Sequence, residues 1–140
     1  MQVLDDKRTL IVKLEAGEPV IASLLTVVRG QGLKGGHLTA IGAVGHARLG
    51  FFHPEEKRYE TRDFRESLEV LSLSGNLAQS DTGPVIHAHV ALGRADFSVI
   101  GGHLFEATVS VTLEVFLAPA SARIERRLDP RFDLKLLHLR

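Results

Sequence analysis

Two histidines separated by one residue, His87 and His89, carry the clearest chemical signal in the sequence. They lie in the apolar run 85–92, which is typical of a β-strand, and alternate residues of a strand project from the same face. A third histidine, His103, lies in the next predicted strand. If the two strands form a hairpin that turns about Asp96, His89 lies directly opposite His103, because both are seven residues from the turn. Three imidazoles would then converge on one face of a sheet.

A cluster of three imidazoles predicts a metal site. Imidazole nitrogen binds zinc at about 2.0–2.1 Å, and three protein ligands leave a fourth position open to water or a small molecule. The chain has no cysteine, so a site here depends on imidazole alone. Zinc is the expected divalent metal, although copper, iron and nickel also accept imidazole. Gly101 and Gly102 precede His103 and indicate a close approach of two backbones or a bulge.

An alternative interpretation of the same residues needs no metal. His87, His89 and His103 could be ordinary polar strand residues or hydrogen-bonded core histidines. The hairpin register decides between the two interpretations, because a shift by one residue would turn His103 to the other face of the sheet.

The four remaining histidines carry a weaker signal and are expected to be solvated or structural: His37, His46, His53 and His138. Two acids in predicted strands, Glu69 and Glu106, could orient a ligand imidazole or accept a proton. Strict alternation turns Glu106 away from His103 unless a bulge intervenes, and Glu69 has no position that spacing alone can assign. Both acids are expected to be salt-bridge partners.

Strands and one helix must position these side chains. Apolar or alternating runs predict strands over residues 7–15, 38–44, 45–52, 68–77, 85–92, 97–109 and 111–117. Pro19 is expected at the first position of a helix that ends at Gly30 and Gly32. The apolar stripe of this helix consists of Val20, Leu24, Val27 and Val28. The pattern predicts an α/β (α+β) fold in which a largely antiparallel sheet packs on one main helix.

The composition suits one globular domain spanning residues 1–140. Of these residues 44% are hydrophobic and 24% are charged, and no apolar run is long enough to cross a membrane. Asp5 and Asp6 stand where a signal peptide needs a basic flank, so we expect a cytoplasmic protein. No phosphate-binding loop, dinucleotide fingerprint or nucleophile elbow is present.

The charge is balanced overall but divided along the chain. Seventeen basic and seventeen acidic residues cancel, which disfavours a simple nucleic-acid binder. Residues 123–140 contain six basic and three acidic side chains, a net +3 that leaves −3 for residues 1–122. We expect this tail to be a solvated final strand with salt-bridged flanks; the alternative is a basic docking edge.

An ordered set of motifs resembles the plant and prokaryote conserved (PPC) domain, and the resemblance covers nearly the whole chain. The motifs are GEPVI (17–21), AIGAV (40–44), LEVLSLSGN (68–76), VIHAHV (85–90), GGHL (101–104) and LEVFL (113–117). The resemblance implies an antiparallel sheet on a helix and a homotrimer. It also implies, for some stand-alone members, a metal held at the positions of His87, His89 and His103.

The resemblance supports two hypotheses of function. Prokaryotic members are often labelled DNA-binding by similarity to plant proteins, which suggests a homotrimeric regulatory module with DNA as a partner. This chain has no Arg-Gly-Arg core and hence no AT-hook to enter a minor groove, which puts that label in doubt. The alternative is a metal-dependent enzyme whose three-histidine site activates water for an unknown small substrate. A third interpretation joins the two hypotheses: the metal, or a small ligand at its open position, biases the contacts between subunits of the trimer.

Overall fold

Nine β-strands and one α-helix form the fold, which a computed structural model describes for residues 1–139. The elements are β1 (Gln2–Asp5), β2 (Leu10–Glu15), α1 (Val20–Gly30), β3 (Gly36–His53), β4 (Arg58–Phe64), β5 (Leu68–Ser80), β6 (Gly83–Gly93), β7 (Val99–Pro119), β8 (Glu125–Asp129) and β9 (Leu134–His138). Within residues 1–139, no helix combines the length and apolar character that a membrane crossing requires.

The strands belong to one sheet in the order β1-β2-β7-β3-β5-β8-β9, with β4 paired to β3 and with β6 paired to both β5 and β7. The ladders β3–β5, β5–β6, β6–β7 and β7–β3 therefore form a closed circuit around an apolar core. All these ladders are antiparallel, and only the short contact between β5 and β8 is parallel among the described pairings. The predicted largely antiparallel sheet with one helix is confirmed.

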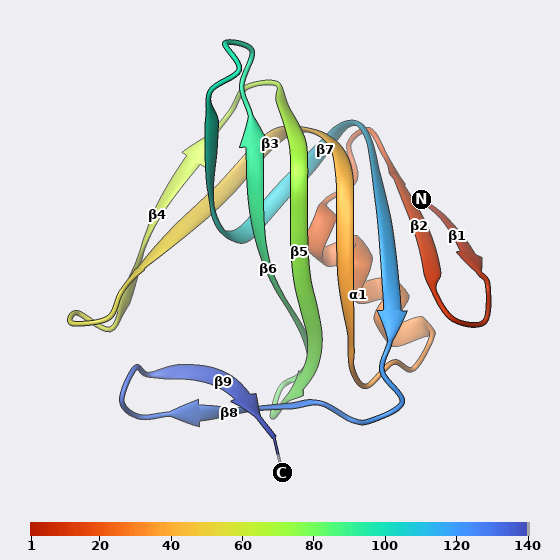
Figure 1. Ribbon diagram of the computed structural model, residues 1–140, viewed down its shortest axis with the longest axis vertical. Helices are drawn as coiled ribbons and strands as arrows, with labels where there is room; N and C mark the ends of the chain where they lie inside the picture. Colours follow the sequence, from red (N-terminus) through yellow and green to blue (C-terminus); the bar gives the residue numbers. More distant parts are fainter. Residues whose placement is uncertain (140) are drawn as a thin grey trace.

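The helix α1 covers this core behind the sheet in the view of Figure 1. Its buried residues are the predicted stripe, namely Val20, Leu24, Val27 and Val28. Pro19, however, lies one position before the helix, with an extended backbone, and not at the first helical position. The reason is tertiary: Pro19 forms an isolated bridge with Thr108 of β7, which keeps it in a strand-like conformation.

Two pairs of predicted strands are in fact two long strands. Residues 38–44 and 45–52 both belong to β3, and residues 97–109 and 111–117 both belong largely to β7. Gly42 permits the continuity of β3, because the ladders to β5 and β7 both change register there. Gly42 has a positive φ, and a Cβ at this position would collide with the Thr112 carbonyl oxygen. The predicted division between residues 44 and 45 is therefore absent, and the irregularity at Gly42 is a β-bulge within one strand.

Three further parts of the fold differ from the prediction. The exposed strands β1 and β4 carry no apolar alternation and were not predicted. The tail forms the hairpin β8–β9 where one final strand was expected. The expected salt-bridged flanks are present: Arg123 and Arg127 contact Glu125, and Arg131 contacts Asp129.

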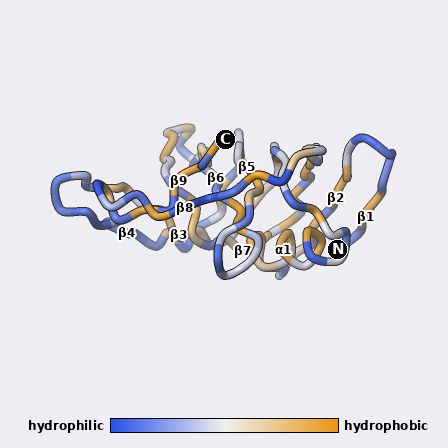
Figure 2. The backbone as a smooth tube through the Cα atoms, turned by 90° about the horizontal axis from the view of Figure 1, so that it is seen from below, coloured by the Kyte–Doolittle hydropathy of each residue, from blue (hydrophilic) through white to orange (hydrophobic). Residues whose placement is uncertain are grey.

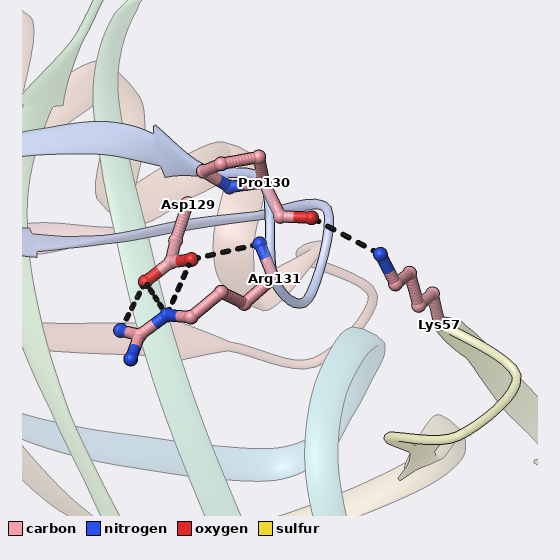
Figure 3. A network of polar contacts seen from close by, with 4 residues as sticks. All are labelled: Lys57, Asp129, Pro130 and Arg131. Carbon is pink, nitrogen blue, oxygen red and sulfur yellow. Dashed lines mark hydrogen bonds and ion pairs between the residues drawn. The ribbon is translucent and has the colours of Figure 1, made fainter.

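The β8–β9 hairpin lies below the main sheet in Figure 1, with its tip near the turn that joins β3 and β4. In Figure 2 the turn between β3 and β4 is hydrophilic, whereas the β8–β9 hairpin contains both hydrophilic and hydrophobic residues. Figure 3 shows the contact between them, in which the Lys57 ammonium donates to the Pro130 carbonyl oxygen at 3.1 Å. Arg131 and Asp129 hold the hairpin turn itself through several hydrogen bonds. This contact joins the β3–β4 hairpin to the C-terminal hairpin.

Candidate metal centre

The β6–β7 turn sets the register on which the histidine cluster depends. Asp96 Oδ1 accepts hydrogen bonds from both the backbone and the hydroxyl of Ser98, at 2.9 and 2.6 Å, and Phe97 adopts a positive φ. This local turn pairs Gly93 with Val99, and the ladder continues to the pair His89 and His103. The register predicted from the sequence is therefore confirmed.

Gly101 and Gly102 provide the close approach that the sequence indicated. A Cβ on Gly101 would lie 2.6 Å from the Val90 carbonyl oxygen, and one on Gly102 would lie 2.8 Å from the Gly50 carbonyl oxygen. Side chains at either position would force β7 away from its neighbours. The two glycines thus let the strand that carries His103 pack closely on both sides.

The three imidazoles of His87, His89 and His103 face one another. One ligand nitrogen from each lies within 4.8 Å of the other two, and the ring centroids are 4.9–5.6 Å apart. His87 Nε2 and His89 Nε2 are 3.2 Å apart. Two nitrogens bound to one tetrahedral ion at about 2.0–2.1 Å are about 3.3 Å apart. The spacing of these donors fits a divalent metal ion.

The surroundings of His103 favour the neutral imidazole that a metal needs. Its ring packs against Tyr59 and Phe105, with centroids 5.0 and 4.6 Å away. Burial, followed by the electrostatic effect of the two neighbouring imidazoles and of Arg126, lowers the pKa of His103 to about 4. His103 Nδ1 is buried without a hydrogen-bond partner in the described part of the chain. An unsatisfied nitrogen in a neutral ring is consistent with a metal ligand.

Burial also lowers the pKa of His87, with Arg126 and His89 acting in the same direction. His87 and His103 therefore lie in an environment that disfavours the imidazolium form, whereas His89 is exposed. The exposed side of His89 leaves a route to the cluster from solvent.

The four remaining histidines are solvated or hydrogen-bonded, as expected, but neither Glu69 nor Glu106 forms the expected salt bridge within residues 1–139. His46 contacts Asp63 at 2.7 Å and His53 contacts Glu60 at 3.0 Å, while His37 and His138 are exposed. Within residues 1–139, no hydrogen bond or ion pair joins Glu69 or Glu106 to an imidazole of the cluster. The ladder between β3 and β7 does shift register next to Glu106, because Arg48 pairs with Glu106 whereas Leu49 pairs with Leu104. That irregularity brings Glu106 into no such contact.

Comparison with known families identifies the relationship that the motifs suggested. Residues 1–121 match the model of the Plants and Prokaryotes Conserved (PCC) domain, the PPC family named above. The chain belongs to this family. Comparison with curated proteins gives no match.

Solved structures of PPC-like chains resemble this one over nearly their whole length. A metal-containing protein from Archaeoglobus fulgidus has 33% identity and a TM-score of 0.87, with 99% of this chain and 96% of that chain covered. A PPC protein from Pyrococcus horikoshii has 28% identity and a TM-score of 0.86, with coverages of 99% and 95%. A candidate DNA-binding protein from Bacteroides thetaiotaomicron has 28% identity and a TM-score of 0.94, with coverages of 98% and 96%.

One residue of this PPC-family chain adjoins the cluster without any signal in the sequence. Arg126 of β8 contacts His87 Nδ1 through its Nη2 at 3.0 Å and donates from the same atom to Asn76 Oδ1 at 2.8 Å. Its Nη1 donates to the Lys135 carbonyl oxygen. Arg126 was predicted as part of a charged tail, and only the folding of the tail beneath β5 and β6 brings it to the histidines.

Proposed function

We propose that this PPC-family chain binds a divalent metal ion, zinc in the first instance, through His87, His89 and His103. The convergence of three imidazole nitrogens from β6 and β7 is the observation that carries the proposal. The lowered pKa of His103 supports it, because the ring is neutral at neutral pH and has a lone pair to offer. The Archaeoglobus fulgidus relative, described as a metal-containing protein, supports it independently.

Metal analysis of matched variants tests this proposal. Purified wild-type protein is expected to bind about one zinc ion per chain after dialysis against zinc and then buffer. His89→Ala should lose that metal while keeping the fold, since His89 is exposed. His138→Ala, at an exposed histidine of β9, is the control and should bind zinc as the wild type does. Equal zinc content in both variants, or none in the wild type, would overturn the proposal.

We also propose that residues 1–140 form one PPC domain and that it assembles as a homotrimer. Ile41 and Phe116 are 59% and 50% exposed and line the same shallow hollow of about 290 Å³ on β3 and β7. Large apolar side chains together on an open sheet face are typical of an interface. Light scattering should give three times the chain mass for the wild type, and Ile41→Glu should reduce it. A monomeric wild type would contradict the assembly.

DNA binding is the second candidate function, favoured by the description of the Bacteroides thetaiotaomicron relative. The charges of the tail make it the weaker candidate. Four basic side chains of the tail pair with carboxylates, namely Arg123, Arg127, Arg131 and Lys135. Binding to duplex DNA should weaken steeply with salt if it occurs. Failure to retain DNA at low salt would remove this function.

Metal-dependent hydrolysis is the remaining alternative. It requires a proton acceptor beside the metal, and within residues 1–139 no carboxylate contacts the three imidazoles. The groups that do surround them are Tyr59, Phe105, Asn76 and Arg126. Such surroundings suit ligand binding better than the activation of water.

A further inference from the structure

We propose that Arg126 and the metal centre together bind a small oxyanion, a carboxylate or a phosphate group. This inference rests on the proposed metal site and names the class of ligand for its open position. Three features of Arg126 carry it: its lack of a counter-charge, its unsatisfied Nε, and its contact with His87.

Arg126 is a partly buried cation that has no acidic partner among the described residues. Its three contacts are all to neutral acceptors: the Asn76 amide oxygen, the Lys135 carbonyl oxygen and His87 Nδ1. Within residues 1–139, no carboxylate forms an ion pair with it, whereas the neighbouring Arg127 pairs with Glu125 at 3.3 Å. Burial lowers the pKa of Arg126, and Tyr59 is the group that opposes this effect. A charge removed from water without a counter-ion is costly, so this site favours an anion.

A bound divalent ion would increase the imbalance. The three imidazoles are neutral donors, so they cancel none of the charge of the ion. The ion and the guanidinium would then place about three positive charges side by side, with no carboxylate of residues 1–139 in contact. An anionic fourth ligand is the direct way to neutralise them.

The hydrogen-bond donors of Arg126 suit such a ligand. Arg126 Nε is buried and has no acceptor among the described residues. Its Nη2 contacts His87 Nδ1, and a guanidinium can only donate, so Nδ1 accepts and the proton of the neutral ring is on Nε2.

A metal bound at His87 Nε2 changes that arrangement. A neutral imidazole has one lone pair, so ligation through Nε2 requires the ring proton to be on Nδ1. Two donors, Nδ1–H and the Nη2–H of Arg126, would then face each other, and Arg126 must give up this contact. Its Nε–H, which has no acceptor among the described residues, and the Nη2–H released from His87 are then available together. Two parallel donors of this kind match the paired oxygens of a carboxylate or phosphate.

Cobalt-substituted protein tests the inference with a readout other than catalysis. The visible spectrum of Co²⁺ responds to its fourth ligand, so titration with oxalate, acetate and inorganic phosphate measures oxyanion binding. Sodium chloride at equal ionic strength is the control for non-specific effects. The carboxylate and phosphate arms show which oxyanion the site prefers.

Three variants separate the role of Arg126 from a general loss of charge. Arg126→Gln should weaken oxyanion binding about tenfold or more, and Arg127→Gln, one residue away and exposed, should bind as the wild type does. Asn76→Asp places a carboxylate where Asn76 Oδ1 now lies, 2.8 Å from Arg126 Nη2. It should also weaken the binding of added oxyanions about tenfold or more, while Arg126 stays in place.

The outcomes distinguish this inference from the proposed metal site. Loss of oxyanion binding in Arg126→Gln and Asn76→Asp, with the cobalt content unchanged, supports it. Wild-type oxyanion affinity in either variant, or a cobalt spectrum that no oxyanion alters, overturns it while the metal site stands. A wild-type protein that binds no metal overturns both.

Discussion

Mild acid should destabilise the metal-stripped protein through the histidine cluster before it protonates the carboxylates. The pKa of His103 is about 4 in the folded protein, against an ordinary value of 6.5. As the pH falls below about 6.5, His103 binds a proton in the unfolded chain but stays neutral in the folded protein. The stabilisation is therefore complete above pH 6.5 and is lost progressively as the pH falls to about 4.

The magnitude follows from the two pKa values. The interval between 6.5 and about 4 corresponds to about 3 kcal/mol of stability in full, of which about 2 kcal/mol is lost between pH 7 and 4.5. The lowered pKa of His87 adds to the loss with the same sign. The pKa values of Asp63 and Asp129 are lowered below 3.8, so their contribution is lost at more acidic pH.

Urea unfolding at several pH values between 7 and 4.5, with a chelator present, measures this loss. His103→Phe keeps an aromatic ring between Tyr59 and Phe105 but cannot titrate. Between pH 7 and 4.5, its free energy of unfolding should therefore fall by about 2 kcal/mol less than that of the wild type. His138→Gln is the control and should follow the wild-type curve. Equal pH dependence in wild type and His103→Phe would refute the reasoning.

Three further predictions concern the framework of the site. Gly101→Val should reduce stability by about 1–3 kcal/mol and abolish metal binding, because its Cβ would lie 2.6 Å from the Val90 carbonyl oxygen; an unchanged melting temperature and zinc content would contradict this. Leu113→Ala, at a position with no exposed surface, should cost about 2–5 kcal/mol in urea unfolding, and a cost below about 1 kcal/mol would show that Leu113 is not core. Lys57→Met removes the contact to Pro130 and should speed tryptic cleavage of the C-terminal hairpin while changing global stability by less than about 1 kcal/mol; identical cleavage rates would argue against that contact.

The parts of the fold predicted correctly were those with regular local patterns. The stripe from Val20 to Val28 predicted the buried face of α1, because a helix with a period of 3.6 residues needs one apolar side. The strands β5 and β6 were found by apolar content. The exposed strands β1 and β4 were not predicted, because a strand that is solvated on both faces shows no alternation of apolar and polar residues.

The long strands β3 and β7 show where local signals mislead. The sequence pattern divides β3 between residues 44 and 45, but two ladders continue across this region, and the backbone forms a bulge at Gly42. The predicted position of Pro19 failed for a similar reason, since its partner Thr108 lies 89 residues away in the chain. Long-range pairing overrides a local preference in both cases.

The sequence by itself determined the histidine cluster. The face shared by His87 and His89 follows from the two-residue period of a strand, and the opposition of His89 and His103 follows from a short turn centred on Asp96. Only the tertiary structure decided what surrounds the cluster. Arg126 and Tyr59 lie on separate hairpins. Arg126 comes 39 residues after His87 in the chain and Tyr59 comes 28 residues before it, and no periodicity of the sequence links such distant segments. The lowered pKa of His103, and the position of Arg126 without an acidic partner among residues 1–139, are both consequences of that packing, because burial and neighbouring charge exist only once the chain has folded.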